Sequence, residues 1–93
     1  MTNAEILTML QVDLGEMFPS EARKAYLQQC ISTAQQFIAR EGVTLTDNIE
    51  DGQLVEMYAA YLVRKRATTE PMPRMLRWTL NNRLFSQKVS GNA

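Results

Sequence analysis

The segment Pro71-Met-Pro-Arg-Met-Leu-Arg-Trp-Thr-Leu-Asn-Asn-Arg-Leu-Phe-Ser-Gln-Lys88 combines a helix-start signal with a regular apolar row. Pro73 suits the first turn of a helix, because the N–H group that proline lacks would have no partner there. Three leucines then recur at intervals of four residues, at Leu76, Leu80 and Leu84. This spacing predicts a helix whose leucine row packs into the core of the protein.

Further apolar side chains widen the surface of this helix beyond one narrow row. They are Met72, Met75, Trp78 and Phe85. A short helix that is apolar over so much of its circumference has more apolar surface than one core covers, and Trp, Met and Arg are enriched in protein interfaces. We therefore expect this helix to contact both its own core and another chain.

The same part of the chain is basic, although the formal net charge of the protein is zero. Residues 1–63 hold nine acids and three bases, whereas residues 64–88 hold seven bases and one acid, so the two parts carry opposite charges of about six units each. The bases of the second part are Arg64, Lys65, Arg66, Arg74, Arg77, Arg83 and Lys88.

Two helices are predicted in the first 42 residues. Thr2 and Glu5 have the spacing of a capping box, and the helix that they start is expected to end near Gly15. A second helix is expected to begin at Ser20 and to end at Gly42, since glycine readily takes the left-handed conformation beyond a helix end. One face of this second helix is apolar and comprises Leu27, Cys30, Ile31, Ala34, Phe37 and Ile38.

The third helix follows a short extended connection. Val43-Thr-Leu-Thr46 is too short to pair as a strand, so we expect a loop that packs Val43 and Leu45 onto the core. Apolar residues then recur at helical spacing, at Leu54, Met57, Tyr58, Tyr61 and Leu62. The sequence therefore predicts one all-α domain, residues 1–93, built as a small bundle of about four helices with an extended loop between the second and third.

The composition argues against an enzyme. The chain has no histidine, which removes the commonest general base and leaves its single cysteine, Cys30, without an imidazole partner. We expect Cys30 to fill space in the core. The acids Asp47, Glu50 and Asp51 lack the spacing of a calcium-binding loop and suit a solvated helix start. We therefore expect no catalytic residues, no metal site and no cofactor.

The longest apolar run, Met57 to Val63, falls far short of the roughly 20 residues of a membrane span, which favours a soluble protein without membrane contact. The basic C-terminal third leaves open the alternative of a small helical DNA-binding protein, in which cations pair with phosphates and Trp78 stacks on a base. Against this, Arg83 is turned from Arg77 by about 240° on a helix, so the cations do not form one stripe. A helical subunit of an unrelated complex is a further alternative.

Two segments resemble the small head-tail connector proteins of tailed bacteriophages and prophages. They are Leu54-Val-Glu-Met-Tyr-Ala-Ala-Tyr-Leu-Val-Arg-Lys-Arg66 and Met72-Pro-Arg-Met-Leu-Arg-Trp-Thr-Leu-Asn-Asn-Arg-Leu-Phe-Ser-Gln-Lys88, and residues 2–15 and 37–42 are also similar. The resemblance implies a helical head-completion adaptor and no enzyme. It implies a ring of about 12 or 13 copies beneath the portal, through which DNA passes without sequence-specific binding.

The partners implied by this resemblance are other copies of the chain, the phage portal protein and a tail-side completion protein. The implied location is the head-tail interface of the virion, after synthesis in the bacterial cytoplasm. We hypothesise that an interface set contributes to subunit or portal contacts: Arg64, Lys65, Arg66, Arg74, Met75, Arg77, Trp78 and Phe85. A second hypothesis places an acidic loop, formed by Asp47, Glu50 and Asp51, towards the channel, where its charge repels DNA.

Overall fold

The computed structural model describes residues 1–67 and 71–91, and these residues form four helices joined by loops, with no strand among them. The helices are α1 (Asn3–Leu14), α2 (Glu21–Arg40), α3 (Ile49–Ala67) and α4 (Arg74–Gly91). The predicted all-α fold with four helices is confirmed, and each predicted helix matches an observed one to within a few residues.

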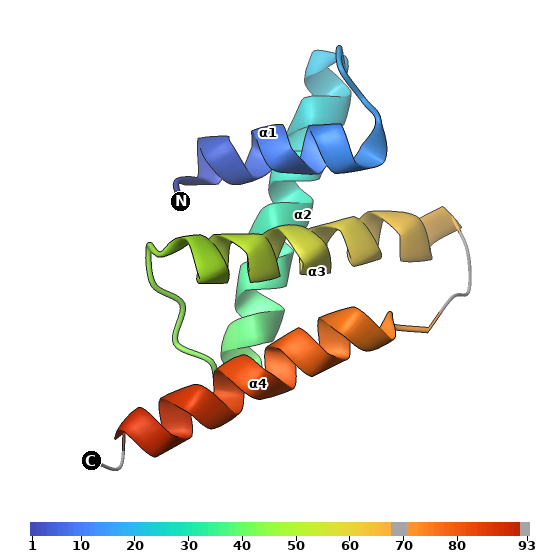
Figure 1. Cartoon of the computed structure of the whole chain (residues 1–93). Coiled ribbons are helices and arrows are strands. Elements are labelled where there is room, and N and C mark those ends of the chain that lie inside the picture. The colour runs from blue at the N-terminus through green and yellow to red at the C-terminus, as the bar shows by residue number, and fades with distance from the viewer. Residues whose placement is uncertain (68–70, 92–93) are drawn as a thin grey trace.

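Three of the helices form a layer in front of the fourth (Figure 1). Helix α3 lies between α1 and α4, and the long helix α2 crosses behind them. Helix α3 packs against all three other helices, and α1 also packs against α2. The layer therefore has two outer helices, α1 on one side and α4 on the other.

The helix ends follow the signals in the sequence. The Thr2 side chain accepts a hydrogen bond of 3.2 Å from the backbone N–H of Glu5, whose carboxylate accepts one of 2.8 Å from the backbone N–H of Thr2. Gly15 follows α1 with a φ of 73°, and Gly42 follows α2 with a φ of 105°. These left-handed conformations favour glycine, so both predicted helix ends are confirmed.

The start of α2 offers a direct test of helix capping. The Ser20 hydroxyl accepts a hydrogen bond of 3.1 Å from the backbone N–H of Arg23. We expect Ser20→Ala to lower the free energy of unfolding by about 1 kcal/mol, because one N–H group at the helix start loses its partner. Urea unfolding followed by circular dichroism measures the change. The control Ser32→Ala, at an exposed position inside α2, should cause no loss, and equal effects of the two substitutions would contradict the capping role.

The core is built from one face of each helix. The buried apolar side chains are Ile6, Leu7, Leu10, Leu27, Cys30, Ile31, Ala34, Ile38, Val43, Leu54, Val55, Tyr58, Ala59, Ala60, Val63, Leu76 and Leu80. The predicted burial of Cys30 and Val43 is thus confirmed, as is that of Leu76 and Leu80, whereas Leu84 is only half-buried. Among the described residues, no helix is both long enough and apolar enough to cross a bilayer.

Helix α4 is fastened to the connection between α2 and α3. The backbone N–H of Thr44 donates a hydrogen bond of 2.7 Å to the side-chain oxygen of Gln87, and the Gln87 amide donates one to the carbonyl of Thr44. The side chain of Leu84 lies so close to Gly42 that an added Cβ there would be only 3.2 Å from it. These contacts hold the predicted extended connection against the last helix.

Candidate interaction surface

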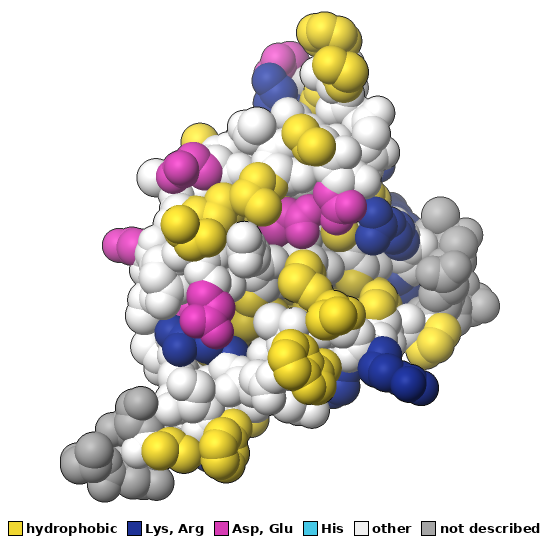
Figure 2. Space-filling model, in the orientation of Figure 1, with side chains coloured by type: hydrophobic (Ala, Val, Ile, Leu, Met, Phe, Trp, Pro, Cys, Tyr) yellow, Lys and Arg dark blue, Asp and Glu magenta, His cyan; other side chains and the backbone are white. Residues whose placement is uncertain are grey.

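Helix α4 carries a second apolar stripe on the side opposite its core row. Met75, Trp78, Phe85 and Val89 are 62, 62, 69 and 58% exposed, and we call them the α4 stripe. At 100° per residue they fall within an arc of about 80°, turned away from the buried Leu76 and Leu80. Figure 2 shows hydrophobic side chains exposed along this helix. The predicted contact of α4 with its own core is confirmed, and its other face remains uncovered.

Exposed cations flank the α4 stripe. Arg74, Arg77 and Lys88 project from the same helix, which contains no acid. Arg77 lies 4.0 Å from Glu41 with its side chain half exposed, whereas Arg74 and Lys88 form no ion pair with residues 1–67 or 71–91. The stripe and its cations together form an apolar surface with a positive edge.

The other cations of the interface set lie in the last turn of α3, where they are exposed but also contact their own chain. The guanidinium of Arg64 is 3.3 Å from the Asp13 carboxylate. Lys65 lies over the ring of Tyr61 at 5.6 Å, and Arg66 lies over Tyr26 at 5.2 Å. The structure therefore brings five members of the interface set together on α4, and holds Arg64, Lys65 and Arg66 on a different helix.

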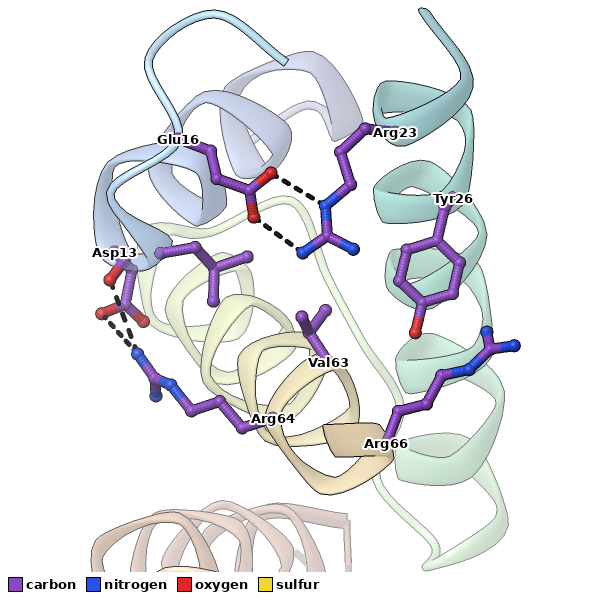
Figure 3. A pocket seen from close by; sticks show the side chains of 8 residues that line it. Asp13, Glu16, Arg23, Tyr26, Val63, Arg64 and Arg66 are labelled. Carbon is purple, nitrogen blue, oxygen red and sulfur yellow. Dashed lines mark hydrogen bonds and ion pairs between the residues drawn. The ribbon is translucent and has the colours of Figure 1, made fainter. Parts of the chain in front are cut away.

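A groove of about 620 Å³ lies between the end of α1, the start of α2 and the end of α3 (Figure 3). Its lining residues are Asp13, Leu14, Glu16, Arg23, Tyr26, Val63, Arg64 and Arg66. Arg23 donates hydrogen bonds of 2.8 and 2.7 Å to the two carboxylate oxygens of Glu16. The Arg23–Glu16 pair therefore fixes the corner between α1 and α2, while Arg64 and Arg66 connect the end of α3 to α1 and α2.

Glu56 is buried beside this groove, with 6% of its surface exposed. Burial is the main reason that its pKa rises to about 8, and a hydrogen bond with Asp13 raises it further, while Arg64 acts in the opposite direction. At neutral pH this carboxyl group is therefore mostly uncharged. Nothing in the sequence distinguishes Glu56 from any other acid on a helix.

Asp51 corrects the prediction of an exposed acidic loop. Its side chain is 1% exposed and lies within 2.5 Å of Arg83 Nε and 3.1 Å of Arg83 Nη2, and it accepts hydrogen bonds of 2.7 and 2.8 Å from Thr46. Burial alone would raise the pKa of Asp51, but the bonds from Arg83 and Thr46 outweigh burial and lower it. The prediction that Asp51 faces a channel is wrong, because the first turn of α3 directs it towards α4. Asp47 and Glu50 are exposed.

The parts of the chain that the structure describes contain no group of three or more metal-binding side chains, and every buried side-chain polar atom there has a hydrogen-bond partner. Comparisons with protein-family models, with curated proteins and with solved structures give no match.

Proposed function

We propose that the protein is a structural subunit of a bacteriophage head-tail connector, an adaptor that forms a ring beneath the portal and extends the DNA exit channel towards the tail. The observation that carries this proposal is the α4 stripe, an exposed apolar row edged by cations. Contiguous apolar surface of this kind commonly marks a protein interface. The resemblance of residues 54–66 and 72–88 to connector proteins favours this assembly over an unrelated helical complex.

Ring formation suits the charge distribution of the chain. Nine of its ten acids precede residue 64, and seven of its ten bases follow residue 63. Arg64, Arg77 and Arg83 pair with acids of their own chain, whereas the exposed Arg74 and Lys88 form no ion pair with the residues that the structure describes. A basic surface on one copy attracts an acidic surface on the next, and such a head-to-tail contact closes into a ring when the rotation between copies allows it. The proposed further partners are the portal, a tail-side completion protein and the DNA that passes through the channel.

The DNA-binding alternative has less support. Arg83 is bound to Asp51 inside the protein, and Lys65 and Arg66 lie over tyrosine rings. Few of the seven cations of this region are therefore left to form a continuous track for phosphates. DNA titrations at two salt concentrations distinguish the functions, because a DNA-binding protein should show an affinity that falls steeply with salt.

Native mass spectrometry of the purified chain over a concentration series tests the proposal. We expect a discrete closed species of about 12 or 13 copies, because a closed ring leaves no free surface for further addition. A continuous series of sizes would indicate an open filament. A chain that stays monomeric at every concentration would contradict spontaneous ring closure.

Charge reversal at Arg74 and Arg77 is expected to weaken this assembly. The double variant Arg74→Glu, Arg77→Glu should need at least about tenfold more protein to assemble at low salt, and its assembly should depend less on salt, because the attraction that salt screens is gone. Sedimentation at low and moderate salt measures both effects. Arg40→Glu, which reverses an exposed cation on α2, is the matched control, and unchanged assembly of the double variant would contradict the role of these cations.

A further inference from the structure

A second exposed apolar patch lies at the corner between α1 and α2. Val12, Met17 and Phe18 are 76, 79 and 94% exposed, and we call them the corner patch. The corner lies beyond α1, on the opposite side of α3 from α4 (Figure 1), and Figure 2 shows hydrophobic side chains protruding there. One copy of the chain therefore presents two apolar patches that cannot cover each other.

Acids outnumber bases around the corner patch, whereas only bases lie beside the α4 stripe. Residues 3–24 hold four acids and two bases, Arg23 and Lys24. Arg23 is bound to Glu16, and Lys24 lies 3.9 Å from Glu21, whose side chain is 95% exposed. Helix α4, by contrast, contains bases and no acid. The two patches therefore complement each other in charge as well as in apolar character.

A two-fold contact between two α4 stripes is less favourable. It would bring Arg74, Arg77 and Lys88 of both copies to one interface, with no acid on either helix to oppose them. Like charges placed together in an interface are destabilising. Charge therefore favours a contact between unlike patches.

Helix α4 is longer than α1. The 18 residues of α4 span about 27 Å, and the 12 residues of α1 span about 18 Å, so one α4 covers α1 and reaches over the corner that follows it. The α4 stripe lies on one outer helix of the layer, and the corner patch lies at the end of the other outer helix, α1, and in the loop that follows it. Docking them together continues the layer from copy to copy, and the last copy meets the first when a ring closes.

We infer that a second copy of this chain covers the α4 stripe with its corner patch, and that Arg74, Arg77 and Lys88 face Glu5 and Glu21 across the contact. This inference rests on the proposed ring, and it adds the two surfaces that join neighbouring subunits. Phe18 of one copy and Trp78 of the next are the central apolar side chains of the contact.

Two variants, each blocking one patch, test the inference. Trp78→Asp places a charge in the α4 stripe, and Phe18→Asp places one in the corner patch; both positions are exposed, so folding should be retained, which circular dichroism checks. Each variant alone should be monomeric at concentrations at least tenfold above those at which the wild-type chain assembles. Their mixture should form a one-to-one dimer and nothing larger, because one intact α4 stripe meets one intact corner patch.

The control is Ile49→Asp, which changes an exposed apolar residue outside both patches and should assemble normally. The same measurements distinguish the results that would overturn the inference. Normal rings from Phe18→Asp would overturn the inference while the proposed ring stands. A homodimer of Phe18→Asp would show a two-fold α4 contact and also overturn it. A mixture that stays monomeric, or a monomeric wild-type chain, overturns it as well. A one-to-one dimer in the mixture together with an open wild-type filament would support the two surfaces and refute the ring.

Discussion

Replacing Asp51 with alanine is expected to lower the free energy of unfolding by about 3–5 kcal/mol, the usual effect of removing one partner of a buried ion pair. The carboxylate accepts hydrogen bonds from both Arg83 and Thr46 and is 1% exposed. Its removal leaves the guanidinium of Arg83 nearly buried, with 13% of the side chain exposed, and without a counter-charge. Urea unfolding at pH 7, followed by circular dichroism, measures the loss.

Glu50→Ala is the matched control for this substitution. Glu50 precedes Asp51 in the first turn of α3, but it is exposed, so its replacement should change stability by less than about 1 kcal/mol. The pKa of Asp51 is lowered in the folded protein, so its charged form stabilises the fold. This contribution is present above the ordinary carboxyl pKa of about 3.9 and is lost as the pH falls below that value. The difference between the wild type and Asp51→Ala should therefore shrink in acid. Equal losses from Asp51→Ala and Glu50→Ala would contradict the ion pair.

The features that the sequence predicted well are those determined by near neighbours in the chain. The capping box of Thr2 and Glu5 needs only three residues of spacing, and Gly15 and Gly42 end helices because of their own backbone freedom. The two faces of α4 were also predictable. The spacing of residues along a helix decides which of them share a face, and it separates Leu76 and Leu80 from the exposed apolar residues.

Features that depend on distant residues were not predictable in this way. In the sequence, Asp51 looks like any acid at a helix start. Its partner Arg83 lies 32 residues later, and the sequence does not show that α4 packs beside the start of α3. The crossing of α2 behind the layer likewise depends on how three helices pack together. Of the candidate interaction surface, the sequence analysis named Met75, Trp78 and Phe85 but missed Val89 and the corner patch. Met17 and Phe18 lie in a short loop, where no periodicity separates exposed from buried apolar residues.

Glu56→Gln is expected to make the protein more stable at neutral and alkaline pH. The pKa of Glu56 rises from about 4.5 in the unfolded chain to about 8 in the folded protein, so the folded protein binds more protons between these values, and its stability falls as the pH rises from 4.5 to 8. One unit of pKa difference corresponds to about 1.4 kcal/mol, so we expect a total loss of about 4 kcal/mol over this range. Glutamine has nearly the same shape, stays neutral and retains a group that donates to Asp13, so the variant should lack this part of the pH dependence.

Urea unfolding at pH 5, 6.5 and 8 checks this expectation for the wild type, Glu56→Gln and Glu50→Gln. Glu56→Gln should equal the wild type at pH 5 and exceed it increasingly up to pH 8, whereas Glu50→Gln should follow the wild type throughout because Glu50 is exposed on the same helix. A constant difference between Glu56→Gln and the wild type at all three pH values would mean that Glu56 does not change its charge in this range. The expected result would mean that the uncharged form of Glu56, which meets Asp13 between α3 and α1, stabilises the fold, and that this stabilisation is lost as the solution becomes alkaline.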